Sequence, residues 1–272
     1  MTFETLSEAE WARVDAAWRA LEEGELERAR AEVEVLRQRR PGHPDVRIVT
    51  AALLIEEGEP EDALVMLRGA ERSADPALLF HLRATAAFDL ARFREAAEDG
   101  RRVVAMRPEM AESHDLVSRA LEHLGDEAAS REHAELAAAL EPDRYPLPLE
   151  IGDDEFDAIV EASLKELPEP VRRQLDELPV VVEPLPSAEL LRAEEPPFPP
   201  DILGLFVGRD LFARSHLDPP AGPGAIFLFR RNLLRFCHDR EELEREIRVT
   251  VQHEVGHLLG LDEDDLDRWG LA

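Results

Sequence analysis

The stretch His253-Glu254-Val255-Gly256-His257-Leu258-Leu259-Gly260-Leu261-Asp262-Glu263 places two histidines four residues apart, with a glutamate directly after the first. If the stretch is helical, both imidazoles lie on one side of the helix and can bind the same metal ion. The glutamate then lies where it can take a proton from water beside that metal. The stretch therefore predicts a zinc centre in a hydrolase, with His253 and His257 as ligands and Glu254 as the general base.

A third protein ligand is expected, because catalytic zinc generally has three protein ligands and one open position. Gly260, three residues after His257, can end the helix in a left-handed conformation and let the chain turn back beneath the metal. That turn would bring Asp262, Glu263 and Asp264 into range. The residue pattern alone leaves these three carboxylates open as alternatives.

The residues before the motif predict a long helix that packs on a sheet. Asp239 and Glu242 form a predicted capping pair for a helix over residues 240–259. Strands are expected at 180–183, 204–208 and 225–229, because these runs are rich in β-branched and aromatic residues. The helix carries an apolar stripe that can cover the sheet, formed by Leu243, Ile247, Val251, Val255, Leu258 and Leu259.

Further helices and loops complete this half of the chain. An aspartate cap at Asp153 predicts a helix to residue 167, and a short helix is expected at about 169–176. The proline-rich residues 184–201 predict an extended loop. If the strand 225–229 lies at the sheet edge, it could hold an extended substrate. Candidate oxyanion donors are His216, His238, Arg230 and Arg231, although each is more readily explained as a structural residue.

Residues 1–143 read as successive helices with an internal repeat. Small turn residues recur 34, 33 and 34 residues apart, each followed five positions later by a small residue, and prolines close the units. This period resembles the tetratricopeptide repeat, which implies four helical hairpins stacked as an α-solenoid. The turn residues are Gly24, Gly58, Ala91 and Gly125, the small residues are Ala29, Ala63, Ala96 and Ser130, and the prolines are Pro41, Pro76, Pro108 and Pro142.

The residues of this half do not predict a catalytic or metal-binding site. Its histidines are scattered and are expected to be structural rather than metal ligands; they are His43, His81, His114, His123 and His133. A domain boundary is expected where the composition changes. The predicted organisation is a helical repeat domain at 1–143, a linker at 144–152 and a small α+β domain at 153–272.

Composition narrows the possible partners. A formal net charge of −28, spread over both halves, argues against nucleic acid and anionic membranes as partners. Cys237 is the only cysteine, so a disulfide framework and a thiolate zinc cluster are excluded, and Cys237 itself is expected to be a partly buried apolar residue. The amino-terminal residues have neither a basic start nor an apolar run. We therefore expect a cytoplasmic protein of bacterial type.

The eleven-residue stretch at 253–263 resembles the extended zincin motif, in which a third ligand follows the second histidine by six residues. With Phe229-Arg230-Arg231-Asn232, Leu178-Pro179-Val180-Val181-Val182-Glu183 and Asp264-Asp265-Leu266, it resembles the minimal zincin-like metallopeptidases of bacteria over about residues 150–272. The resemblance implies a compact α+β domain with one Zn²⁺ and Glu263 as its third ligand. Two departures stand out: the family commonly has aspartate at that position, and no methionine follows Met110.

The expected function is that of a zinc-dependent metallopeptidase-like hydrolase. A metal-activated water would attack a peptide bond while Glu254 takes up the proton. The repeats would recruit a peptide or protein substrate, or a protein partner. One alternative is a non-catalytic interaction scaffold with a structural or inactive zinc site. Another is a regulator whose acidic tail, residues 262–267, binds a different cation.

Overall fold

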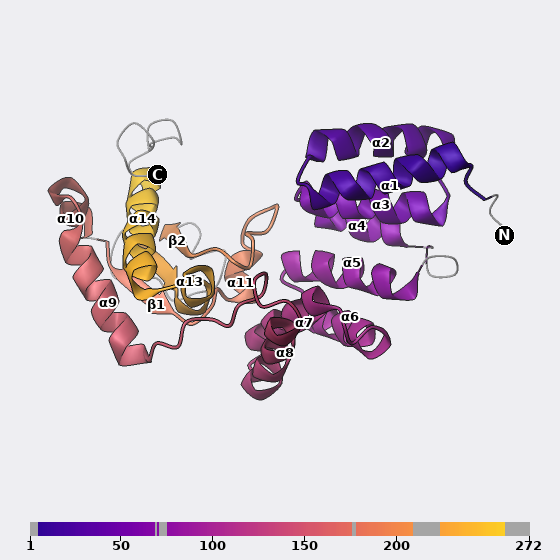
Figure 1. Cartoon of the computed structure of the whole chain (residues 1–272). Coiled ribbons are helices and arrows are strands. Elements are labelled where there is room, and N and C mark those ends of the chain that lie inside the picture. Colours follow the sequence, from indigo (N-terminus) through magenta and orange to yellow (C-terminus); the bar gives the residue numbers. More distant parts are fainter. Residues whose placement is uncertain (1–4, 69, 71–74, 176–177, 209–223, 259–272) are drawn as a thin grey trace. The chain divides into compact units, whose positions relative to one another are not determined.

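The computed structural model describes residues 5–68, 70, 75–175, 178–208 and 224–258. By its internal contacts the chain divides into two compact units, Met1–Tyr145 and Pro146–Ala272 (Figure 1). Each unit is described by itself. Within the part of the chain that the structure describes, no helix is long and apolar enough to cross a membrane.

The first unit is a stack of antiparallel helix pairs. Each helix packs on the next along the chain, and α1, α3, α5 and α7 also contact one another in succession. This pattern of contacts between neighbouring hairpins is that of an α-solenoid. The helices are α1 (Glu8–Glu22), α2 (Leu26–Arg39), α3 (Pro44–Glu56), α4 (Pro60–Leu67), α5 (Pro76–Asp89), α6 (Phe93–Met106), α7 (Ala111–His123) and α8 (Glu127–Leu140).

The predicted turn residues join the two helices of each hairpin. Gly24, Gly58 and Gly125 have φ angles of 71°, 75° and 76°, and Ala91 has a φ of 51°. This left-handed conformation suits glycine and strains an alanine, whose Cβ crowds the backbone. The repeat interpretation is confirmed at all four turns, and one of them tolerates a residue that is not glycine.

The small residues on the second helix of each hairpin are buried as predicted. Ala29, Ala63 and Ala96 are fully buried. Ser130 is also buried, and its hydroxyl lies 3.1 Å from that of Ser118 on the facing helix. The absence of a large side chain at these positions lets the two helices of a hairpin approach closely.

The histidines of the first unit serve structural contacts. His81 pairs with the hydroxyl of Ser113 at 2.9 Å, and the ring of His123 stacks on Phe93. α7 and α8 bring His114 and His133 together, with their Nδ1 atoms 2.9 Å apart, a pairing that their scattered positions in the sequence did not suggest. His114 Nε2 donates to the carbonyl of Pro108, so the proton between the two rings comes from His133.

The second unit is an α+β domain. Its three-stranded sheet has the order β1-β3-β2, with β3 parallel to β1 and antiparallel to β2. The elements are α9 (Asp153–Glu166), α10 (Glu169–Leu175), β1 (Val180–Glu183), α11 (Ala188–Leu191), β2 (Gly204–Gly208), β3 (Gly224–Phe229), α13 (Arg230–Phe236) and α14 (Arg240–Leu258).

The central position of β3 corrects the expectation that it could hold a substrate at a sheet edge. Both of its sides are hydrogen-bonded, to β1 and to β2, so β1 and β2 are the edges of the described sheet. The order follows from burial, because β3 is the most apolar of the three strands and is buried at five of its six residues. A strand buried on both faces gains most from a central place.

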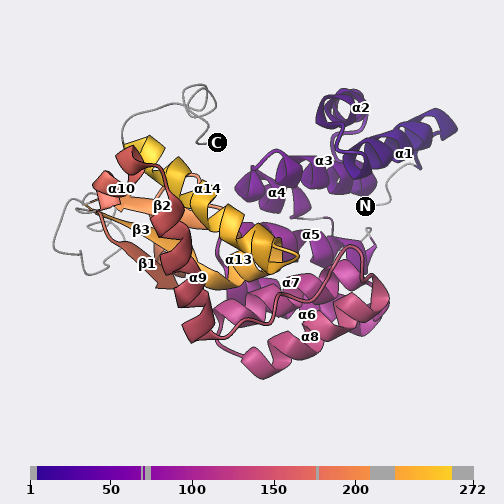
Figure 2. The same cartoon turned by 60° about the vertical axis from the view of Figure 1, so that its left-hand side comes forward.

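The sheet is covered on both faces. α9 and α14 lie across one face (Figure 2), where Phe156, Ile159, Ile247 and Val251 form a core with β3. On the other face, Leu190 of α11 packs with residues of β2 and β3. Cys237, just after α13, is buried, and burial raises its pKa to about 12. Cys237 is thus a buried member of an apolar cluster, as expected.

Three local features differ from the sequence prediction or are missing from it. The proline-rich segment contains the short helix α11, which Ser187 caps by accepting a hydrogen bond from the Leu190 N–H. α13 was not predicted from the sequence. Asp153 is the first helical residue of α9 rather than its cap, and its carboxylate pairs with Arg230 instead. Prolines on both sides of α11 leave room between them for one helical turn.

Candidate metal centre

The candidate site lies on the last described helix, α14, whose start is fixed by two carboxylates. Asp239 accepts a hydrogen bond from the Glu242 N–H at 2.8 Å, and Glu242 accepts one from the His238 N–H at 2.7 Å. The backbone and side chain of His238 lower the pKa of Glu242. The predicted capping pair is thus present, with the second carboxylate bound one residue earlier than in a standard capping box.

The apolar stripe of α14 fixes which side of the helix faces the sheet. Leu243, Ile247, Val251 and Val255 are all fully buried. They recur every four residues, so they form one face of the helix, as the sequence predicted; Leu259 and the side chain of Leu258, also assigned to the stripe, lie outside the described residues. His253 and Glu254 lie beside this stripe, near the carboxyl end of the described helix, and Glu254 contacts β2 there.

Glu254 is buried against the edge of the sheet. The residue is 9% exposed, and its Oε2 accepts a hydrogen bond of 2.6 Å from the backbone N–H of Phe206. The carboxylate comes from α14 and the donor from β2, 48 residues earlier in the sequence. A charged hydrogen bond in a buried position fixes the carboxylate firmly. The predicted general base is therefore held by the sheet as well as by its own helix.

The Phe206 N–H lies on the edge of β2 with which no described strand pairs. Phe229 N donates to the carbonyl of Leu203, the residue before β2, so Leu205 and Val207 also turn their backbone groups toward β3. Gly204, Phe206 and Gly208 then turn theirs away from β3. Glu254 thus occupies one of the outward donors of an edge strand. The sequence gave no signal for this contact, because nothing in Phe206 marks its amide as a partner.

Gly204 lets α14 come close enough for this contact. A Cβ built on Gly204 would lie 2.5 Å from Cγ2 of Thr250 and 2.9 Å from the carbonyl oxygen of Phe227. Thr250 is buried on α14, one turn before Glu254. A glycine is therefore required where the helix crosses the start of β2.

The described part of the chain contains only some of the predicted ligands. His253 is half-buried on α14. His257 is helical, but its side chain lies outside the described residues, and so do Gly260, Asp262, Glu263 and Asp264. Among the described side chains, no group of three or more His, Cys, Asp or Glu could hold a metal ion. The ligand set therefore stays a prediction.

The described candidate oxyanion donors make contacts away from His253 and Glu254. His238 lies at the start of α14, 15 residues before His253, which is roughly 22 Å along a helix. Its imidazole contacts Glu242 at 3.0 Å. Arg230 pairs with Asp153, and the Arg231 N–H donates to the carbonyl of Pro184. His216 lies outside the described residues.

The residues present fit zinc in type and spacing. α14 continues as a helix through His257, so His253 and His257 are one turn apart, and a buried carboxylate follows the first of them directly. Neutral imidazoles one turn apart are common zinc ligands. A carboxylate that directly follows one of them and is held by a backbone N–H is placed to take up a proton beside such a metal.

Residues 175–271 match the family model described as zincin-like metallopeptidase. This part of the chain is similar to that family. Residues 20–85 match a tetratricopeptide-repeat model, so the zincin-like domain is preceded by tetratricopeptide repeats. No curated protein matches the chain.

The family matches cover less than the two units. The zincin-like match begins within α10, so α9 lies before it, although the sequence resemblance had been placed from about residue 150. The repeat match ends within α5, and the later hairpins continue the same packing beyond it. Both the family and the order of the two parts agree with the sequence prediction.

Proposed function

We propose that the chain is a zinc-dependent metallopeptidase-like hydrolase with Glu254 as its general base. The observation that supports this most strongly is the 2.6 Å hydrogen bond between the Phe206 N–H and Glu254 Oε2. It places a buried carboxylate directly after a histidine and at the edge of a sheet. A peptide that lies along β2 would have its backbone beside this carboxylate.

In this proposal His253 and His257 hold Zn²⁺ together with a third ligand. We propose Glu263 for that ligand, with Asp262 and Asp264 as the alternatives. Bound zinc would supply a Lewis acid that polarises a peptide carbonyl and makes water more acidic. The carboxylate of Glu254 would take a proton from the attacking water and pass it to the nitrogen of the leaving amine. The Phe206 N–H would keep the carboxylate in place throughout.

The experiment compares bound zinc and peptide hydrolysis in the parent and three variants. Glu254→Gln should keep zinc and lose at least about 100-fold in hydrolysis, because a general base contributes roughly that much or more. His257→Ala should lose zinc. Glu246→Gln is the matched control: it makes the same change on the same helix, two turns earlier, and should keep both properties. Zinc can be measured by plasma mass spectrometry and hydrolysis with a library of quenched fluorescent peptides.

Two outcomes would contradict the proposal. Full hydrolysis by Glu254→Gln with zinc still bound would show that another group takes the proton. A parent that binds no zinc would remove the metal from the mechanism.

The same hydrogen bond also supports a second candidate, an interaction scaffold with a structural or inactive zinc site. A buried carboxylate that ties α14 to β2 could serve stability alone. Bound zinc without hydrolysis of any library peptide would favour this scaffold. In that case Glu254→Gln should chiefly lower the stability of the second unit.

The repeats add a proposed recruiting role. Stacked hairpins of this kind offer extended surfaces to peptides and proteins, and we propose that the first unit binds the substrate or a protein partner. We also propose a cytoplasmic setting, supported by the single, buried cysteine. The strongly acidic charge makes nucleic acid and anionic membrane surfaces unfavourable partners.

A further inference from the structure

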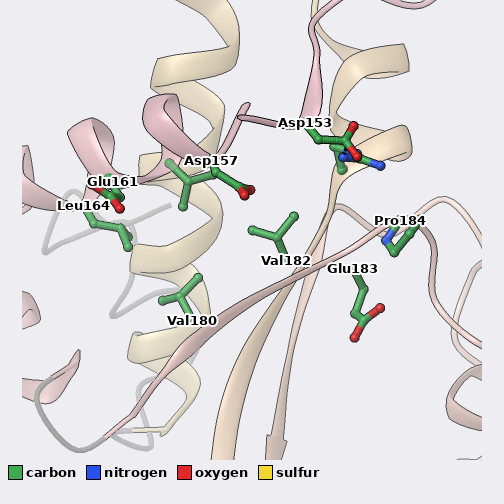
Figure 3. Close-up of a pocket in the computed structure, with 10 residues that line it drawn as sticks. Asp153, Asp157, Glu161, Leu164, Val180, Val182, Glu183 and Pro184 are labelled. Atoms are coloured by element: carbon green, nitrogen blue, oxygen red, sulfur yellow. Dashed lines mark ion pairs between the residues drawn. The ribbon is translucent and has the colours of Figure 1, made fainter. Parts of the chain in front are cut away.

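A groove of about 550 Å³ lies between α9 and β1, on the edge of the sheet opposite to β2. Its floor is apolar and is formed by side chains of both elements. Figure 3 shows Val180 and Val182 rising from β1 toward α9, with Leu164 reaching down from the helix. Glu183 points to the other side of the strand. The groove thus gives access to both sides of an edge strand.

β1 turns unpaired backbone groups toward the groove. Ile226 N donates to the carbonyl of Pro179, which fixes the ladder so that Val181 and Glu183 turn their backbone groups toward β3. The N–H and C=O groups of Val180 and Val182 then point away from β3. No other described strand pairs with this edge. An extended peptide could therefore add to β1 as a further strand.

The groove is strongly acidic, and part of that charge is unbalanced. Asp153, Asp157 and Glu161 follow one another at intervals of four residues on the face of α9 that lines the groove. Like charges at this spacing weaken a helix unless something compensates them. Asp153 pairs with Arg230, the cation that lines the groove in the described part of the chain, and Glu161 lies 3.6 Å from Lys165.

Asp157 and Glu183 are left without compensation. Neither side chain has a hydrogen bond or ion pair with another residue that the structure describes. Asp157 lies on the helix side of β1, whereas Glu183 points to the opposite side of the strand (Figure 3). A cationic side chain on each side of an added strand would meet one of them.

We propose that the groove between α9 and β1 binds an extended peptide segment with two adjacent basic residues. Neighbouring residues of a strand point to opposite faces. Two adjacent arginines would therefore place one guanidinium near Asp157 and the other near Glu183, while the peptide backbone pairs with Val180 and Val182. The peptide side chains next to the arginines would cover the apolar floor. This inference does not rest on the proposed function, because Glu254 contacts β2 at the other edge of the sheet.

The test measures binding of short labelled peptides to the full chain by fluorescence anisotropy. The probe is a capped hexapeptide, Ala-Val-Arg-Arg-Val-Ala. Moving the arginines two positions apart places both on one face, and this peptide should bind more weakly than the probe. N-methylation at both arginines removes donors from the strand and should abolish binding. Asp157→Asn and Glu183→Gln should each weaken binding roughly threefold to fivefold, the contribution of an exposed ion pair.

Two control variants distinguish peptide binding in the groove from attraction to the overall negative charge and from binding at the candidate metal centre. Asp154→Asn makes the same change in charge three residues before Asp157 on α9, at a position that does not line the groove, and this variant should bind the probe like the parent. Glu254→Gln should also bind normally. Asp157 and Glu183 are exposed, so circular dichroism should show that their variants remain folded.

The inference would be overturned if the parent did not bind the probe, or if the N-methylated peptide bound as tightly as the probe. It would also be overturned if Asp154→Asn weakened binding as much as Asp157→Asn does. Weaker binding by Glu254→Gln would place the peptide at β2 instead.

Discussion

Replacing Gly204 by alanine should force α14 away from β2. The added Cβ would lie 2.5 Å from Cγ2 of Thr250, and it would also lie 2.9 Å from the carbonyl oxygen of Phe227. Both distances are well below ordinary van der Waals contact, and neither neighbour is the far end of a flexible side chain. Overpacking of this kind costs about 1–3 kcal/mol, so we expect the second unit to lose about 2 kcal/mol of unfolding free energy.

A second substitution tests whether Thr250 causes the effect. Thr250→Ser removes Cγ2 and keeps the hydroxyl, which alone should cost about 0.8 kcal/mol for one buried methyl group. In the double variant the closest contact is gone, whereas the contact with the Phe227 carbonyl remains. The double variant should therefore be less destabilised than the sum of the single variants, by about 1 kcal/mol.

Urea denaturation followed by pulsed hydrogen exchange and mass spectrometry can report the two units separately. Peptides from α14 and β3 should unfold at lower urea in Gly204→Ala, and peptides from α5 should keep the parent midpoint. Because the same movement would stretch the bond between Glu254 and Phe206, zinc affinity and hydrolysis should fall as well. An unchanged midpoint in Gly204→Ala, or strict additivity with Thr250→Ser, would refute this close approach of helix and strand.

Two further predictions concern the first unit. Ala91→Gly should stabilise it by about 0.5–1 kcal/mol, because Ala91 has a φ of 51°. Gly58→Ala should destabilise it by about 1 kcal/mol at the equivalent turn, and thermal unfolding measures both changes in stability. Burial, followed by the charge of His114, lowers the pKa of His133 below its ordinary 6.5. At pH values below about 6.5 the unfolded chain then binds a proton that the folded chain does not, so stability should fall as the pH drops. His133→Gln should flatten this dependence between pH 7.5 and 5.5 in urea titrations; an unchanged slope would show that other groups cause it.

Local patterns predicted most elements of the fold. Glycines and an alanine at a spacing of about 34 residues marked the four hairpin turns, because a left-handed turn depends on the residue that makes it. The strand β1 was predicted with its observed limits, since prolines bound it on both sides. Asp239 marked the start of α14, because a helix cap is a contact between residues that are near neighbours in the sequence.

Contacts between distant residues were not predictable in this way. The order of the strands depends on which one gains most from burial on both faces, so the sequence left open whether the strand 225–229 lies at an edge, and the structure places it in the centre. The bond between Phe206 and Glu254 joins residues 48 positions apart through a backbone amide, which every residue except proline possesses. The sequence also did not show that Asp157 lies beside the edge of β1, because this position depends on how α9 packs on the sheet.

The hydrogen bond to Phe206 also restricts how the sequence of β2 can change over evolution. Leu203 turns its carbonyl toward β3, and Phe206, three residues later, turns its amide toward Glu254. Inserting or deleting a single residue between them would reverse the direction of that amide and leave the buried carboxylate facing the wrong side of the strand. Related sequences should therefore gain or lose residues here only in pairs, even where the side chains themselves vary freely.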